Sequence, residues 1–177
     1  MNKIWKILYW SITLARIAVV GLLFLNPLIA VVVSMFLDTV DAPAVFKVKH
    51  KWSFYTRYDK ALDLWWYIFI VIYCRNLFIY PVILALFIFR AIGQVPAIFT
   101  TRHKILFWFP NVLENFFVLY LLVVYFWPQY LFYFVGWNVI IPIGIAFLSK
   151  IPQEFILHRF CPDNDWHPVI RKLYLKI

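Results

Sequence analysis

Long apolar blocks separated by short polar groups restrict this chain to a few kinds of fold. Six such blocks occupy residues 7–25, 27–41, 59–75, 77–99, 105–126 and 130–149. A helix crosses a bilayer core with about 20 apolar residues, and a backbone in lipid must satisfy its own hydrogen bonds. Only 14% of the residues are charged and 65% are hydrophobic, whereas soluble domains have about 25% charged residues. We therefore predict an all-α, polytopic membrane protein with six transmembrane helices.

The two ends of the chain are more polar than the region between them. We predict one transmembrane domain over residues 1–149 and a cytoplasmic tail over residues 150–177. An alternative for the first eleven residues is an amphipathic helix along the membrane interface, because Lys3 and Lys6 lie among apolar side chains. After the second block, Pro43 disfavours helical geometry at Ala42 and predicts that the helix bends or ends there.

Basic residues gather on one side of the membrane when the six spans alternate in direction. The other side receives only Arg75, at its edge. The positive-inside rule makes the basic side cytoplasmic, with both termini on it. The net charge of +9 follows from this asymmetry, which also attracts anionic lipid headgroups, so the charge does not indicate a nucleic acid partner. The residues on this side are Lys3, Lys6, Lys47, Lys49, Lys51, Arg57, Lys60, Arg102, Lys104, Lys150, Arg159, Arg171, Lys172 and Lys176.

Four aspartates lie where the second block ends and the third begins: Asp38, Asp41, Asp59 and Asp63. Spacings of three and four place each pair on one helix face, and a helical hairpin would bring the two faces together. Carboxylates in one pocket repel each other unless cations or protons neutralise them. Oxygen ligands favour Mg²⁺, Mn²⁺ or Ca²⁺ over Zn²⁺. The cluster therefore predicts a divalent metal site with these four residues as candidate ligands.

The same four residues have a structural interpretation that the sequence leaves open. The first pair can form the polar end of one span, and the second pair can lie in the first turn of the next, where the helix dipole favours anions. The second block is short, at about 22 Å for 15 residues, which predicts that Asp38 lies below the membrane surface. Carboxylates at that depth are usually functional.

The pattern Asp38-x2-Asp41 followed by Asp59-x3-Asp63 resembles the CDP-alcohol phosphotransferases, whose motif reads D-x2-D-G-x2-A-R-x8-G-x3-D-x3-D. The match in register spans residues 38–63, and residues 12–16, Ile-Thr-Leu-Ala-Arg, are similar to a segment that often opens the family's first span. Six spans, small size and a cytoplasmic site are also similar to this family. The family's Gly, Ala, Arg and Gly are replaced here by Ala42, Val45, Phe46 and Tyr55.

The resemblance implies a membrane transferase in phospholipid biosynthesis, which moves a substituted phosphate from a CDP-linked lipid donor to a small alcohol acceptor and releases CMP. It implies that Asp38, Asp41 and Asp59 hold one or two Mg²⁺ or Mn²⁺ ions, and that Asp63 accepts the proton of the acceptor alcohol. It also implies a homodimer. In place of the motif arginine, phosphate contacts are expected from Lys47, Lys49 or Arg57, since lysine binds phosphate as a point charge.

Further charged residues lie inside the predicted spans. Arg90 and Glu114 are each about ten residues from the loop at 100–104, which places them at the same depth on antiparallel helices and predicts a buried ion pair. Arg16 in the first span can reach either the interface or the aspartate pocket. Two other functions stay open: a catalytically inactive metal-binding member of the same fold, and a small transporter or channel with a polar path through the aspartates, Arg90 and Glu114.

Overall fold

The computed structural model describes residues 3–48, 52–100 and 104–160, and these residues are entirely helical or connecting, which confirms the all-α prediction. The elements, in chain order, are α1 (Lys3–Ala18), η1 (Val19–Phe24), α2 (Pro27–Val48), α3 (Trp52–Cys74), α4 (Tyr80–Thr100), α5 (Lys104–Trp108), α6 (Val112–Phe126), η2 (Pro128–Phe134), η3 (Gly136–Val139) and α7 (Ile140–Phe160).

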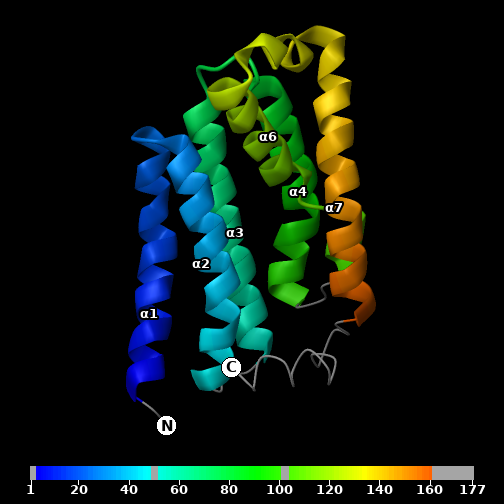
Figure 1. Cartoon of the computed structure of the whole chain (residues 1–177). Helices are drawn as coiled ribbons and strands as arrows, with labels where there is room; N and C mark the ends of the chain where they lie inside the picture. Colours follow the sequence, from blue (N-terminus) through cyan, green and yellow to red (C-terminus); the bar gives the residue numbers. More distant parts are fainter. Residues whose placement is uncertain (1–2, 49–51, 101–103, 161–177) are drawn as a thin grey trace.

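The long helices run up and down in a bundle (Figure 1). α1 packs against α2, α3 packs against α4, and α6 packs against α7, while α2 and α3 follow each other in the chain and run in opposite directions (Figure 1). The end of α2 and the start of α3 lie at the same end of the bundle as the start of α1 and the end of α7 (Figure 1). This end is the one that the charge pattern predicts to face the cytoplasm.

Two helical segments of the described residues are long and apolar enough to cross a membrane, Lys3–Phe24 and Tyr80–Thr100. A third is added if Pro128–Phe134 and Gly136–Pro152, which are bent by 96° to each other, form one span. Large apolar side chains face outward on both segments, such as Leu14 at 64% and Ile92 at 56% exposure. The structure therefore supports two or three of the six predicted spans by length and composition.

Several helices extend beyond the predicted spans. A single helix, α1, runs from Lys3 to Ala18, so the described part of the first eleven residues is continuous with the following segment. Helix α2 continues through Pro43 to Val48, so the second helix is not short, and Asp38 has a side chain that is 59% exposed. Helix α7 runs to Phe160 and so continues past residue 149, where the sixth predicted span ends.

The fifth and sixth predicted helices are both interrupted. Helices α5 and α6 are separated at Pro110, because proline lacks the N–H of a helical hydrogen bond and disfavours helical geometry in the residue before it. Asn111 then caps α6, its side chain accepting a hydrogen bond from the Glu114 backbone N–H at 3.4 Å. Before α7, Gly136 has a φ of +59°, a conformation that glycine adopts without steric cost.

Buried apolar side chains from η1, α2, α3, α4 and α6 form the main core, with Leu23, Ile70, Ile83, Leu113 and Phe116 all inaccessible. A smaller cluster of Tyr9, Ile12 and Ala44 joins α1 to α2, with Tyr58 of α3 packed against it. Ala44 and Tyr58 are close in sequence to Asp41 and Asp59, so this second cluster helps to fix the three helices that carry the candidate site.

Gly93→Ala is expected to destabilise the bundle. A Cβ atom at Gly93 would lie 2.5 Å from Cβ and 2.6 Å from Cγ of Phe109, so α4 would have to move away from the break between α5 and α6. Overpacking of this kind typically costs about 1–3 kcal/mol, to be measured as a lower unfolding midpoint. The control is Gly144→Ala in α7, where a Cβ meets nothing within 4 Å. Equal midpoints for the two variants would contradict this packing.

Candidate functional site

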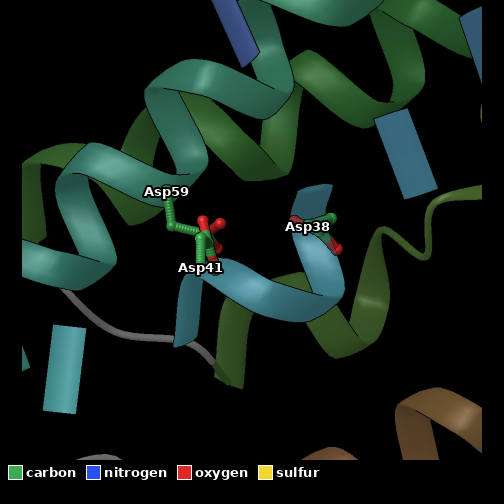
Figure 2. Close-up of side chains that lie close together, drawn as sticks. All are labelled: Asp38, Asp41 and Asp59. Atoms are coloured by element: carbon green, nitrogen blue, oxygen red, sulfur yellow. The ribbon is translucent and has the colours of Figure 1, made fainter. Parts of the chain in front are cut away.

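The hairpin of α2 and α3 brings the aspartates together, as their helical spacing predicts. Asp41 on α2 and Asp59 on α3 point toward each other, and Asp38 lies one turn away on α2 (Figure 2). One carboxylate oxygen from each of these three residues lies within 4.8 Å of the other two. Asp41 is 1% exposed and Asp59 is 8% exposed, so two of the three carboxylates are withdrawn from solvent.

Arg16 of α1 contacts all four aspartates. Its Nη1 donates to Oδ1 of Asp59 at 3.1 Å and also to Oδ2 of Asp41. Its Nη2 lies 2.9 Å from Oδ1 of Asp63 and 3.0 Å from Oδ1 of Asp38. The sequence allowed Arg16 to reach either the membrane interface or the aspartate pocket. In the structure its guanidinium lies in the aspartate pocket.

Lys60 is a second cation in the cluster, and sequence reasoning missed it. Its Nζ lies 2.7 Å from Oδ2 of Asp59 and 2.8 Å from Oδ2 of Asp63. Four carboxylates against the charges of Arg16 and Lys60 leave a formal charge of −2 in the cluster. The spacing of Lys60 and Asp63, three residues apart on one helix, was the signal that could have indicated this pair.

Polar and aromatic contacts fix the α1 backbone one turn before Arg16. Thr13 Oγ1 donates to the backbone carbonyl of Tyr9 at 2.9 Å and accepts a hydrogen bond from the hydroxyl of Tyr58 on α3. The rings of Tyr9 and Tyr58 are 5.6 Å apart. Because both α1 and α3 contribute, this junction orients the arginine toward the carboxylates.

The residues proposed for phosphate binding are placed only in part. Arg57 is exposed and donates to the backbone carbonyl of Phe99, at the end of α4, at 3.4 Å. The side chain of Lys47 and the whole of Lys49 lie outside the described residues. The side chains of Phe46 and Tyr55, which replace the motif's arginine and glycine, lie outside them as well.

Arg90 and Glu114 have different partners from those predicted. Arg90 donates from Nε to Oε1 of Gln94 at 3.2 Å, and from Nη1 to the backbone carbonyl of Phe109. Glu114 accepts from Nδ2 of Asn111 at 2.7 Å. The described contacts of Arg90 and Glu114 include no ion pair between them. The helix break at Pro110 leaves the backbone carbonyl of Phe109 without a helical partner, and Arg90 binds this carbonyl.

These side chains form a buried polar path beside the aspartates. Gln94, which is inaccessible, donates from Nε2 to the backbone carbonyl of Lys60 at 2.7 Å. On the other side of Arg90, Asn111 donates to the hydroxyl of Tyr67 at 2.6 Å. The path therefore joins α3, which carries Asp59 and Asp63, to α4 and to the N-terminus of α6.

The chemistry of the cluster fits a divalent cation. Hard cations bind oxygen at about 2.0–2.6 Å, so oxygens up to about 5 Å apart can share one ion, and the oxygens of Asp38, Asp41 and Asp59 satisfy this limit. Two of these carboxylates are buried, where anions require compensating charge. The cluster can therefore hold a metal or, with Arg16 and Lys60 alone, serve as a polar junction between helices.

Comparison of the chain with protein-family models, with curated proteins and with solved structures finds no match.

Proposed function

We propose that this protein is a membrane transferase that moves a substituted phosphate from a CDP-alcohol to an acceptor alcohol, with release of CMP, in phospholipid biosynthesis. The observation that carries the proposal is the convergence of Asp38, Asp41 and Asp59 from α2 and α3, with oxygens within 4.8 Å of one another. These are the positions that the resemblance to CDP-alcohol phosphotransferases assigns to metal binding.

Asp38, Asp41 and Asp59 are the residues that would hold Mg²⁺ or Mn²⁺. A divalent ion bound there supplies charge neutralisation for the donor's phosphates and stabilises the departing CMP. Asp63 is not among the three aspartates whose oxygens cluster this closely in the described residues, and its side chain is 14% exposed. It is therefore the carboxylate left to act as a base.

The proposed reaction is a direct transfer. The acceptor hydroxyl gives its proton to the Asp63 carboxylate, and its oxygen forms a bond to the phosphorus that carries the lipid alcohol. The bond from that phosphorus to the bridging oxygen breaks, and CMP leaves with that oxygen. A base within hydrogen-bond reach of the hydroxyl typically contributes about 10² to 10⁴ in rate.

Six membrane passes with both termini in the cytoplasm belong to the same proposal. The apolar, outward-facing side chains of Lys3–Phe24 and Tyr80–Thr100 support contact with lipid. The aspartate cluster lies toward the end of the bundle where α2 and α3 meet, so a nucleotide would approach from the cytoplasm and the donor's lipid tail would lie along the helices. A homodimer is the expected assembly.

A second candidate goes beyond the inactive metal-binding protein that the sequence left open: an inactive protein of the same fold that binds no metal, in which the cluster joins α1 to α2 and α3. The observation that favours it is the pairing of the four aspartates with Arg16 and Lys60. In this candidate, Arg16 and Lys60 compensate two of the four carboxylate charges and the cluster serves as a polar junction between the helices. The two candidates differ in whether the aspartates bind a divalent ion.

Mn²⁺ binding by the purified chain in lipid nanodiscs tests the proposal, with free Mn²⁺ followed by electron paramagnetic resonance. Wild type is expected to bind, and Asp41→Asn is expected to weaken binding at least about tenfold, about 1.4 kcal/mol, because it removes one of a few charged ligands. Glu114→Gln is the control, since it removes a half-buried carboxylate outside the cluster. Failure of wild type to bind would favour the inactive candidate.

A further inference from the structure

We infer that Arg16 is a built-in counter-ion of the metal-free state, and that its guanidinium and a divalent cation compete for the same carboxylates. This inference rests on the proposed function, because it concerns the ion that the function requires. It adds a property of the chain itself: metal affinity is set by a residue of α1, outside the hairpin that carries the aspartates.

The contacts of Arg16 are the first argument. Each of the three candidate ligands is bound by the same guanidinium, with Nη2 at 3.0 Å from Asp38, Nη1 at 3.1 Å from Asp59, and Nη1 against Asp41. An ion bound to the same three oxygens would have to lie about 2.0–2.6 Å from each. That space is the one that the nitrogens of Arg16 take up.

The second argument is that the α3 carboxylates have no oxygen without a cation. Asp59 has Oδ1 bound by Arg16 and Oδ2 bound by Lys60. Asp63 repeats this arrangement, with Oδ1 bound by Arg16 and Oδ2 by Lys60. An ion that binds Asp59 must therefore either share an oxygen with Arg16 or Lys60, which brings two cations into contact, or displace one of them.

Arg16 is the cation that an ion at the three candidate ligands displaces, since Arg16 contacts each of them, whereas the described ion pairs of Lys60 include Asp59 alone of the three. Arg16 is 8% exposed, so its charge and that of the ion would meet in a poorly solvated place where like charges repel strongly. The two states of the site are then Arg16 on the carboxylates, or the metal on the carboxylates with Arg16 withdrawn.

The experiment compares Mn²⁺ affinities of wild type, Arg16→Gln and Lys60→Gln in nanodiscs. The two variants remove the same charge from the same cluster, so any difference between them reports the contacts and not only the charge. Arg16→Gln is expected to bind Mn²⁺ at least about tenfold more tightly than wild type, and Lys60→Gln is expected to gain less. Mn²⁺ is also expected to raise the unfolding midpoint of Arg16→Gln more than that of wild type.

Arg16→Lys provides a second test if the glutamine variant does not fold. Lysine keeps the charge but lacks the fork that reaches four carboxylates at once, so this variant is expected to bind Mn²⁺ more tightly than wild type. Affinity equal to or weaker than that of wild type in both Arg16 variants, or equal gains for Arg16→Gln and Lys60→Gln, would overturn the inference and leave the proposed function intact. Absence of Mn²⁺ binding in wild type and every variant would instead overturn the proposed function.

Discussion

Replacing Arg16 by glutamine is expected to lower the free energy of unfolding of the metal-free protein by about 3–5 kcal/mol, the usual loss when one partner of a buried ion pair is removed. Arg16 contacts all four aspartates, and its loss leaves Asp59 and Asp63 with one described cation, Lys60. The measurement is denaturant unfolding in detergent micelles with a chelator present.

The control for this prediction is Arg57→Gln. Arg57 is exposed and has a single 3.4 Å hydrogen bond to the Phe99 carbonyl, so its loss is expected to change stability by less than about 0.5 kcal/mol. The double variant Arg16→Gln with Asp41→Asn should recover part of the loss, since it also removes a buried negative charge. Similar stabilities for the Arg16 and Arg57 single variants would show that the arginine does not hold the cluster together.

The second large effect is expected from Asp63→Asn, which should reduce the rate of CMP release by about 10² to 10⁴. The amide keeps the size of the carboxylate but cannot take the acceptor's proton. Mn²⁺ binding should change little, because Asp63 lies outside the group of Asp38, Asp41 and Asp59 in the described structure. Steady-state CMP release and Mn²⁺ affinity are measured on the same preparation.

Two results would argue against this role of Asp63. Loss of Mn²⁺ binding together with activity would identify Asp63 as a ligand and not a base. Full activity of Asp63→Asn would show that another group accepts the proton. Glu114→Gln is again the matched control, because the described contact of the Glu114 carboxylate is with Asn111, outside the aspartate cluster.

The sequence predicts the helical architecture well, because long apolar blocks have few other stable conformations. It predicts the helix boundaries less well, because the deciding interactions are tertiary. Pro43 lies within α2, whereas Pro110 separates α5 from α6. The local rule for proline is the same at both positions, so the sequence alone could not tell which of them interrupts a helix.

The candidate site also has features that local sequence predicts and features that depend on tertiary contacts. Helical spacing was enough to predict that the aspartates of α2 and α3 face each other, and the structure places Asp41 and Asp59 in this way (Figure 2). The cations were harder to predict. Arg16 reaches the cluster from α1, which no local spacing encodes, and Lys60 was interpreted only as one of many cytoplasmic basic residues.

Arg90 and Glu114 illustrate why depth alone does not define a pair. Both residues were predicted at one level of the bundle, yet Arg90 binds Gln94 and the Phe109 carbonyl, and Glu114 binds Asn111. The break at Pro110 supplies these alternative partners. A backbone carbonyl exposed by a broken helix is a strong acceptor in an apolar environment, and it cannot be identified before the break is known.

The most direct test of the account is CMP release by the purified wild-type chain in lipid. The protein is incubated with Mg²⁺ or Mn²⁺, with CDP-diacylglycerol-like or CDP-archaeol-like donors, and with a panel of polyol and sugar-phosphate acceptors. We predict CMP release that requires both the divalent ion and an acceptor alcohol, and that stops when a chelator is added. No CMP release with any donor and acceptor, from protein that binds Mn²⁺ through Asp41, would contradict the proposed transferase activity.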